Sequence, residues 1–226
     1  MNVARMVLAT FDEIMKKRKI IILDFDGVIV DSRELALEYT QKQYEGVTEE
    51  IHRNLFCGNI FTEMEKLKST NITKAELDNF LEKSYWPRKK QLPPIKDMDK
   101  IIERLNKTYE IVINTSSDSR RVADYLEKWN LLHYFKKIYG KDTHKSKVEK
   151  FKLILKEFGV GNKDCILVTD TIGDIIEAQV AGIGSVGVSW GYQQHRHFIS
   201  LGREITLIEQ PADLMRAIEE HFKVIN

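Results

Sequence analysis

The chain has 226 residues, of which 42% are hydrophobic and 31% are charged, as in ordinary soluble globular proteins. Its formal net charge of +1 gives no reason to expect a nucleic acid or an acidic membrane as a partner. The two cysteines, Cys57 and Cys165, are too few for a disulfide framework, so we expect a reducing, cytoplasmic setting.

The first 18 residues have the pattern of an amphipathic helix. Apolar side chains fall at helical spacing, at Val3, Val7, Phe11, Ile14 and Met15. The uncharged run from Met6 to Phe11 is too short for a signal peptide or a membrane span. We expect this helix to pack on the core; binding to a partner is the alternative.

The first strand is predicted at Ile20–Leu23, where four aliphatic residues indicate a strand buried on both faces of a parallel sheet. Asp24 and Asp26 follow at its carboxyl end, and Gly27 allows a sharp turn. Strand ends of this kind face the ligand crevice of open α/β sheets. Two carboxylates this close repel each other unless a cation or a shared proton compensates. They suggest a site where one carboxylate does covalent chemistry, the other transfers protons and a cation neutralises both. A plain acidic turn is the alternative.

Residues 29–94 have helical patterning and lack an aliphatic run typical of a buried strand. Ser32 is a plausible helix N-cap, and Thr73 with Glu76 has the spacing of a capping box. Pro93 and Pro94 end the segment in extended structure. We therefore predict a small all-helical insertion here.

From residue 97 onward, helices and strands alternate, which predicts an α/β fold with a Rossmann-like, doubly wound parallel sheet. This core comprises residues 1–28 and 95–226, and residues 29–94 form the inserted helical domain. The predicted strands are Ile111–Ile113, Phe135–Tyr139, Ile166–Val168, Val186–Val188 and Ile205–Ile208, and the predicted helices are Met98–Leu105, Val122–Trp129, Val148–Phe158, Ile175–Ala181 and one from Ala212 onward.

Two more strand ends carry suitable polar residues. Thr115 and Ser116 follow the strand at 111–113, where hydroxyl and backbone N–H groups can cradle a phosphate, although both types are also routine N-caps. Asp170 ends the strand at 166–168, and Asp174 lies one helical turn further on. The four acids, Asp24, Asp26, Asp170 and Asp174, are thus predicted to converge as an oxygen-rich environment suited to Mg²⁺.

These motifs resemble those of the haloacid dehalogenase superfamily of phosphatases and phosphomutases. Asp24-Phe25-Asp26-Gly27-Val28 is similar to the first motif, Thr115-Ser116 to the second, Lys145 to the third, and Thr169-Asp170 through Asp174 to the fourth. The segments Ala178–Ile183 and Gly187–Tyr192 resemble the phosphoglycolate-phosphatase-like branch.

Two positions depart from the family pattern. Thr169 stands where the family usually has glycine, and it either crowds the metal site or supplies an extra hydroxyl. Ser146 follows Lys145 where proline is common, which makes Lys147 a rival for the lysine's role.

The resemblance implies a Mg²⁺-dependent phosphatase acting through an aspartyl-phosphate. Asp24 is the implied nucleophile and Asp26 the acid and base. The implied metal ligands are Asp24, the Asp26 backbone carbonyl, Asp170 and Asp174, while Thr115, Ser116 and Lys145 hold the phosphoryl oxygens. A phosphomutase remains the alternative, and a non-catalytic binding protein ranks last because both catalytic acids are present.

By the same resemblance, the insertion is a cap that selects the substrate, with Arg53, Gly58 and Asn59 as candidate contacts. We expect a sharp backbone turn at Gly58, between two helices. We interpret Arg88-Lys89-Lys90 as solvated surface, with attraction of an anionic substrate as the alternative, and His195 and His197 as surface residues. The expected partner is a small-molecule phosphate ester, with no nucleic acid and no membrane, and the chain is expected to be a monomer or homodimer.

Overall fold

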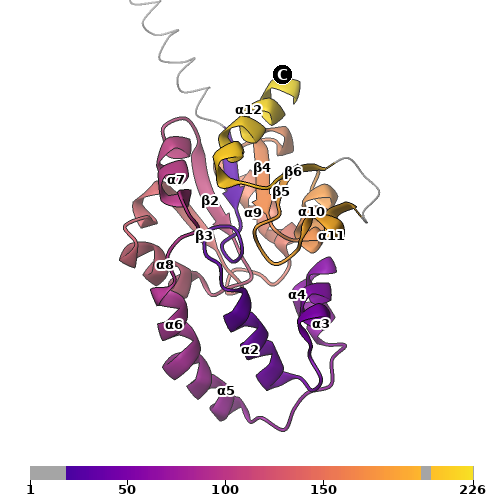
Figure 1. The fold of residues 1–226 in the computed structure, drawn as a ribbon. Coiled ribbons are helices and arrows are strands. Elements are labelled where there is room, and N and C mark those ends of the chain that lie inside the picture. Colours follow the sequence, from indigo (N-terminus) through magenta and orange to yellow (C-terminus); the bar gives the residue numbers. More distant parts are fainter. Residues whose placement is uncertain (1–18, 200–204, 226) are drawn as a thin grey trace, which may run out of the picture.

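The structure, a computed structural model, describes residues 19–199 and 205–225; the helix predicted within residues 1–18 lies outside them. Six strands form one parallel sheet in the order β3-β2-β1-β4-β5-β6 (Figure 1). Their bounds are β1 Ile20–Leu23, β2 Glu110–Asn114, β3 Phe135–Tyr139, β4 Cys165–Thr169, β5 Gly184–Val188 and β6 Thr206–Ile208. The predicted α/β fold with a doubly wound parallel sheet is confirmed.

Helices cover both faces of the sheet, and β1 shows why its sequence is continuously aliphatic. Ile21 and Leu23 belong to the core cluster that α7, α8 and α12 complete, whereas Ile20 and Ile22 belong to the cluster with α9 and α10. All four side chains are fully buried. These helices are α7 Met98–Asn106, α8 Ser119–Lys128, α9 Lys147–Phe158, α10 Ile172–Val180 and α12 Leu214–Ile225.

Shorter helices connect these elements. The sequence analysis did not predict α11 (His195–Ile199), which packs Phe198 against the core while His195 is exposed, as expected. The remaining short turns are η3 Leu132–Tyr134, η4 Asn162–Asp164 and η5 Pro211–Asp213. None of the helices in the described part of the chain is long and apolar enough to cross a membrane.

Between β1 and α7 the chain forms helices, grouped at the end of the molecule opposite the C-terminus (Figure 1). They are α2 Arg33–Gln43, α3 Glu49–Asn54, η1 Leu55–Cys57, α4 Ile60–Met64, α5 Lys74–Phe80, the π-helical turn η2 Leu81–Tyr85 and α6 Trp86–Gln91. The capping box of Thr73 and Glu76 forms as predicted. The Ser32 side chain, however, does not cap α2, because its hydroxyl bonds elsewhere.

The two connections of this helical segment to the sheet region lie side by side. Val30 and Pro94 form an antiparallel bridge, and the Ile95 N–H donates to the Ile29 carbonyl at 2.8 Å. The chain therefore leaves the sheet region and returns to it at one place.

Candidate active site

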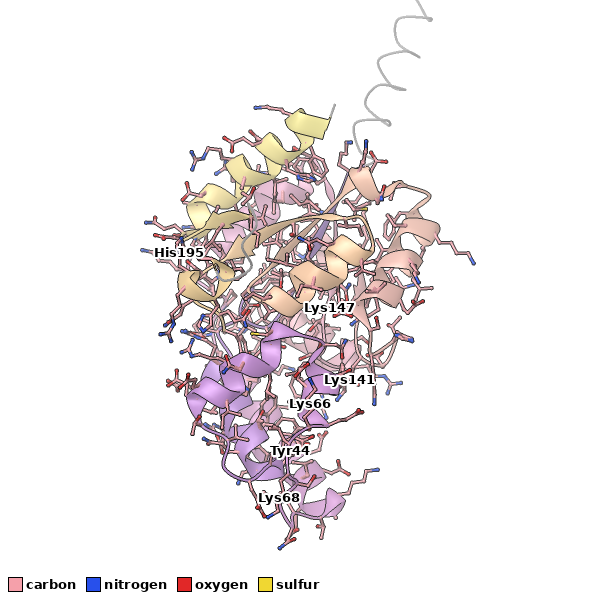
Figure 2. All side chains as sticks on the ribbon, turned by 90° about the vertical axis from the view of Figure 1, so that its right-hand side faces the viewer. Tyr44, Lys66, Lys68, Lys141, Lys147 and His195 are labelled. Carbon is pink, nitrogen blue, oxygen red and sulfur yellow. The ribbon has the colours of Figure 1, made fainter. Side chains whose placement is uncertain are left out.

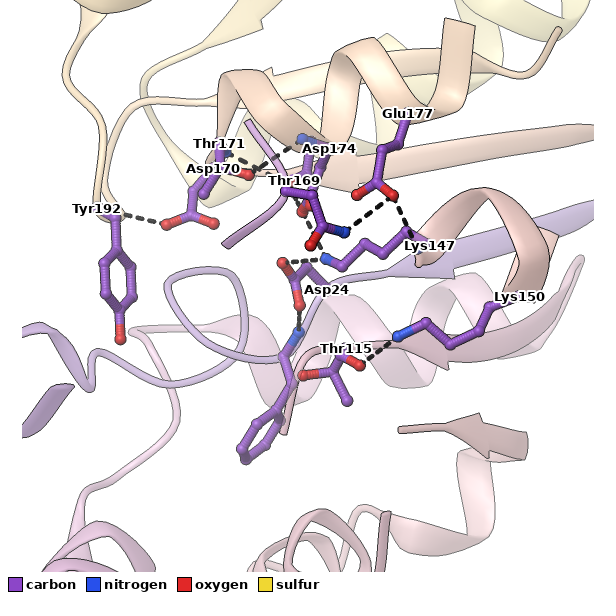
Figure 3. A network of polar contacts seen from close by, with 12 residues as sticks. Asp24, Thr115, Lys147, Lys150, Thr169, Asp170, Thr171, Asp174, Glu177 and Tyr192 are labelled. Carbon is purple, nitrogen blue, oxygen red and sulfur yellow. Dashed lines mark hydrogen bonds and ion pairs between the residues drawn. The ribbon is translucent and has the colours of Figure 1, made fainter. Parts of the chain in front are cut away.

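The candidate site lies at the carboxyl edge of the sheet, around the end of β1. This strand lies between β2 and β4, so Asp24 is flanked by Thr115 and by Asp170, which follow those two strands (Figure 3). The three residues are buried. The parallel topology therefore gathers polar groups that are far apart in the sequence.

Lys147, the first residue of α9, is the cation that meets Asp24. Its Nζ lies 2.7 Å from Asp24 Oδ2 and 2.5 Å from Asp174 Oδ2, and its side chain is only 2% exposed. Burial raises the pKa of the Asp24 carboxyl well above its usual range, with Lys147 opposing the rise and Asp174 adding to it. Despite burial, the two carboxylates raise the pKa of the Lys147 ammonium, so it stays charged.

Lys145, the lysine expected from the motif, does not occupy this position. Its Nζ lies 5.6 Å from the centroid of the Phe61 ring, although the residue still borders the cavity described below. The reason is geometric: Lys145 precedes α9, whereas Lys147 is inside its first turn and projects toward β1. Lys147, the alternative suggested by the absence of proline after Lys145, is therefore the lysine that pairs with Asp24.

Asp174 is held by Thr169, the residue that departs from the family pattern. The Thr169 hydroxyl donates to Asp174 Oδ2 at 2.6 Å, so the threonine supplies an extra hydrogen bond. Burial raises the pKa of the Asp174 carboxyl, but Lys147 and the hydrogen bonds to it lower the pKa on balance.

Asp170 has one oxygen bonded and one free. Oδ2 accepts the Tyr192 N–H at 2.6 Å, whereas the buried Oδ1 has no hydrogen-bond partner among the described residues. A Cβ on Gly27 or on Gly191 would lie 1.9 or 2.2 Å from Oδ2, so only glycine fits at either place. Burial raises the pKa of the Asp170 carboxyl to about 7, with Asp174 adding to the rise.

Asp26 faces a different set of partners. Ser117 donates to its Oδ2 at 2.7 Å, Lys89 Nζ lies 2.5 Å from its Oδ1, and the Ser32 hydroxyl also donates to Oδ1. Although burial raises the pKa of the Asp26 carboxyl, Lys89 and the two hydroxyls lower it on balance.

Lys89 is a site residue that the sequence analysis missed. It was interpreted as part of a solvated basic cluster, but its side chain is 1% exposed. Its Nζ also lies 5.1 Å from the Phe25 ring centroid and 4.8 Å from that of Trp86. Tyr85 and Trp86, which lie four and three residues before it in the sequence, were the available signal.

The phosphate-cradle candidates line the same cavity. The Thr115 hydroxyl accepts the Ser117 N–H at 3.0 Å, and the Thr115 carbonyl accepts Lys150 Nζ at 2.6 Å. Burial, together with the neighbouring Lys147 ammonium, lowers the pKa of the Lys150 amine to about 7. Ser116 borders the cavity beside Thr115. The sequence analysis did not predict Lys150 as a residue of the site.

Of the three candidate substrate contacts in the helical segment, Gly58 and Asn59 border the cavity and Arg53 does not. Arg53 donates to the Tyr192 carbonyl at 2.8 Å and pairs with Glu49, so it fastens α3 to the core. Asn59 Nδ2 donates to Glu177 at 3.2 Å. The backbone of Gly58 is extended, with φ −142°, and is not the sharp turn expected there.

The arrangement of the carboxylates around Asp24 shows whether a metal ion fits at this edge of the sheet. Within residues 19–199 and 205–225, no three or more His, Cys, Asp and Glu side chains are arranged to hold a metal ion. Magnesium, however, commonly takes only one or two carboxylates and keeps several waters. Asp24 and Asp174 share the Lys147 ammonium, and the neighbouring Asp170 has a buried oxygen without a hydrogen-bond partner among the described residues. These residues therefore fit a divalent cation, although the four carboxylates do not converge on one point as expected.

A cavity of about 360 Å³ opens over these groups, between the sheet edge and the helical segment. Asp24, Asp26, Asp170, Thr115 and Ser116 border it from the sheet side. Residues from α2, α4, η2 and α6 border it from the other side. The reactive groups thus lie in a confined space that a small molecule can enter.

Comparison with known proteins identifies the architecture. The family model described as "Haloacid dehalogenase-like hydrolase" matches residues 21–188. The phosphoglycolate phosphatase of Aliivibrio fischeri is 29% identical over 196 residues, which cover 77% of this chain and 85% of that protein. The phosphoglycolate phosphatase of Vibrio cholerae is 25% identical over 199 residues, which cover 79% and 87%.

Solved structures show the same fold at lower identity. A hydrolase from Pseudomonas syringae aligns with a TM-score of 0.72 at 19% identity, over 89% of this chain and 98% of that one. A predicted phosphatase from Clostridium acetobutylicum aligns with a TM-score of 0.71 at 17% identity, over the same shares. With the family match over most of its length and the acids at the expected strand ends, the chain belongs to the haloacid dehalogenase-like hydrolases and is similar to their phosphoglycolate phosphatases.

Proposed function

We propose that this haloacid dehalogenase-like phosphatase hydrolyses a small-molecule phosphate monoester through an aspartyl-phosphate on Asp24, with Mg²⁺ as cofactor. The observation that carries the proposal is the Asp24 carboxylate, which borders the cavity and lies 2.7 Å from Lys147 Nζ. The Lys147 ammonium opposes the rise that burial causes in the pKa of the Asp24 carboxyl, and it therefore favours the ionised form that a nucleophile needs.

In the first step, an Asp24 oxygen attacks phosphorus and the bond from phosphorus to the alcohol oxygen breaks. Asp26 donates a proton to that oxygen, so a neutral alcohol leaves. In the resting enzyme Asp26 is held ionised by Lys89, Ser117 and Ser32. A phosphoryl dianion bound beside it raises the pKa of its carboxyl, which favours the acid form when substrate is present.

In the second step, Asp26 takes a proton from water as the water oxygen attacks the phosphorus of the aspartyl-phosphate. The bond from phosphorus to Asp24 breaks, and inorganic phosphate and the free carboxylate result. We assign the equatorial oxygens in both steps to the Thr115 hydroxyl, the Ser116 N–H and the Lys147 ammonium. Thr115 and Ser116 border the cavity and Lys147 lies on Asp24, which supports this assignment. Lys147 takes this role in place of Lys145.

Asp24, the Asp26 backbone carbonyl and Asp170 would hold the magnesium ion, with Asp174 orienting them or binding through water. When bound, the ion neutralises charge on the transferring phosphoryl group. The buried oxygen of Asp170, which has no hydrogen-bond partner in the described part of the chain, supports this assignment.

We further propose that residues 29–94 form a cap domain over the core and that this cap selects the substrate. The helices of this segment border the cavity across from the catalytic acids, which supports that role. A cytoplasmic setting fits the two free cysteines, and a monomer or homodimer remains our expectation.

The test is phosphate release from p-nitrophenyl phosphate with Mg²⁺. Asp24→Asn keeps the shape of the side chain but removes its charge, so turnover falls about 10³-fold or more. Asp31→Asn, at an exposed acid paired with Arg33, is the matched control. EDTA abolishes activity, Mg²⁺ restores it, and Ca²⁺ supports it poorly because its bonds are longer and its geometry looser.

Three outcomes contradict the proposal. Near-wild-type turnover in Asp24→Asn would exclude the nucleophile, and full activity after verified metal removal would exclude the cofactor. Quantitative transfer of the phosphoryl group to a second alcohol without phosphate release would identify a phosphomutase.

A further inference from the structure

The two sides of the cavity differ in chemistry. The sheet side carries the catalytic acids and hydroxyls, whereas the helical side is built largely of aromatic and aliphatic side chains. Among the latter are Tyr39, Phe56, Phe61, Met64, Leu81 and Trp86. Because phosphoryl chemistry takes place on the sheet side, the alcohol part of the ester must lie against this apolar wall.

The wall offers no positive charge to an anionic substrate. No Lys, Arg or His of the described residues 33–91 borders the cavity, and the one charged cap residue that does is Glu65. Neighbouring cap lysines are engaged elsewhere: Lys66 pairs with Glu63 at 2.7 Å, and Lys42 Nζ lies 4.7 Å from the Phe80 ring centroid. Burying a carboxylate against such a wall without a partner is costly.

The cations that do border the cavity, Lys141 and Lys145, belong to the loop between β3 and α9 on the core. In Figure 2, Lys141 is labelled above Lys66, Tyr44 and Lys68, at the height of the cap helices. Lys145 Nζ lies over the Phe61 ring. Among the described residues that border the cavity, these two lysines are the only cations, and both belong to the core side and not to the cap side.

The size of the cavity agrees with its chemistry. A volume of about 360 Å³ lies in the range of pockets that enclose ligands much larger than a two-carbon alcohol. Such a small group leaves most of the apolar wall in contact with water. A ring or branched chain removes that wall from water and gains binding energy that the enzyme can use in the transition state.

We propose that the preferred substrate is a phosphate monoester of a bulky, apolar or aromatic alcohol without a carboxylate, and therefore not phosphoglycolate. This inference rests on the proposed phosphatase function. It differs from what the names of the relatives suggest because it follows from the cap side of the cavity, where this chain places rings instead of cations.

The experiment compares kcat/KM for three esters of aliphatic alcohols: 2-phenylethyl phosphate, ethyl phosphate and 2-phosphoglycolate. Using aliphatic alcohols avoids the better leaving ability of phenols. We expect 2-phenylethyl phosphate to exceed ethyl phosphate by about 10–100-fold, and 2-phosphoglycolate to be no better than ethyl phosphate.

A pair of variants locates the preference. Phe61→Ala lowers the ratio of kcat/KM for the phenylethyl ester to that for the ethyl ester at least about tenfold. Phe80→Ala, which removes a cap ring that does not border the cavity, leaves that ratio unchanged. Thermal unfolding of both variants confirms that the cap remains folded.

The outcomes separate the two proposals. A preference for 2-phosphoglycolate over ethyl phosphate, lost in a Lys141→Met/Lys145→Met double variant, overturns the substrate inference and leaves the phosphatase function intact. If no ester is hydrolysed, the proposed function fails. Calorimetric binding of the same esters then decides the inference, and tighter binding of 2-phosphoglycolate than of 2-phenylethyl phosphate overturns it.

Discussion

Lys145 and Lys147 stand two positions apart, yet only the second reaches Asp24. Ser146 is the N-cap of α9, so the chain enters the helix between the two lysines and turns their side chains in different directions. Lys147 points into the buried acid cluster, while Lys145 remains exposed beside the cap. A local change in backbone direction thus decides which amine meets the reacting group.

We expect Lys147→Met to lower kcat/KM for p-nitrophenyl phosphate by about 10²–10³-fold, because it removes the charge beside Asp24 and the transferring oxygens. Lys145→Met, a matched change two residues away, should cost less than about tenfold. Steady-state kinetics at saturating Mg²⁺ check this, with circular dichroism as the control for folding. A larger loss in Lys145→Met would reverse the assignment.

Much of the acidic part of the site was predictable from the sequence because strand ends in a parallel sheet meet at one edge. This principle places Asp24, Thr115 and Asp170 together without any tertiary information. Lys89 and Tyr192 could not be found in this way. Their roles depend on how the cap and the 190–193 loop pack against the core. For Lys89, the nearby aromatic residues Tyr85 and Trp86 were only an indirect signal.

At the scale of elements, α6 connects the proposed cap to Asp26, the proposed acid. It carries Lys89 onto Asp26, while its neighbour Arg88 points outward to Glu38. We expect Lys89→Met to lower kcat about 10–100-fold with a smaller effect on KM, because Asp26 loses the partner that positions it. Arg88→Met removes only an exposed ion pair and should change kcat less than about twofold.

These two variants are compared by kcat and KM on the same ester, with thermal unfolding measured alongside. If Lys89→Met lowers thermal stability but its folded fraction has normal kcat and KM, then Lys89 has a purely structural role.

A second contact between elements joins α10 to the η1 turn and the loop after it. A Cβ on Gly173 would lie 2.2 Å from the Gly58 carbonyl oxygen, so the backbones touch. We expect Gly173→Ala to destabilise the fold by about 1–3 kcal/mol and to displace the loop that borders the cavity. Chemical denaturation and kcat/KM measure the two effects. Gly161→Ala, where the new Cβ makes ordinary contact at 3.4 Å, is the control.

The elements of the core were largely predictable because each has an unambiguous pattern. β3 has the predicted bounds, and α9 begins one residue before the predicted helix. The prediction for the loop at Gly58 was wrong in detail, because a glycine between two helical patterns suggested a sharp turn. The backbone of Gly58 is extended instead. The residue at this contact that must lack a side chain is Gly173 in α10, because a Cβ there would collide with the Gly58 carbonyl oxygen.

At the scale of the whole molecule, stability should depend on pH through His52. This ring is buried against Phe56 and Tyr192, and its Nε2 has no hydrogen-bond partner among the described residues. Burial lowers the pKa of His52 from 6.5 to about 4, with Arg53 lowering it further and Glu49 opposing. The unfolded chain therefore binds more protons than the folded one between these values.

It follows that stability is lost as the pH falls from about 6.5 to about 4, by up to about 3 kcal/mol. We expect His52→Phe to remove this part of the pH dependence, and His133→Phe, at an exposed ring, to keep it. Urea denaturation at several pH values gives the free energies of unfolding. Parallel pH profiles for wild type and His52→Phe would contradict the expectation.

The bridge between Val30 and Pro94 places the beginning and the end of the inserted segment next to each other. An insertion whose ends meet can change in length without moving the sheet, because the entropy of closing a loop grows only slowly with its length. Evolution can therefore exchange one insert for another at this point while the phosphoryl-transfer groups stay in place. The same feature makes this position a suitable junction for hybrid enzymes, in which the segment between Val30 and Pro94 is replaced by the corresponding segment of a relative.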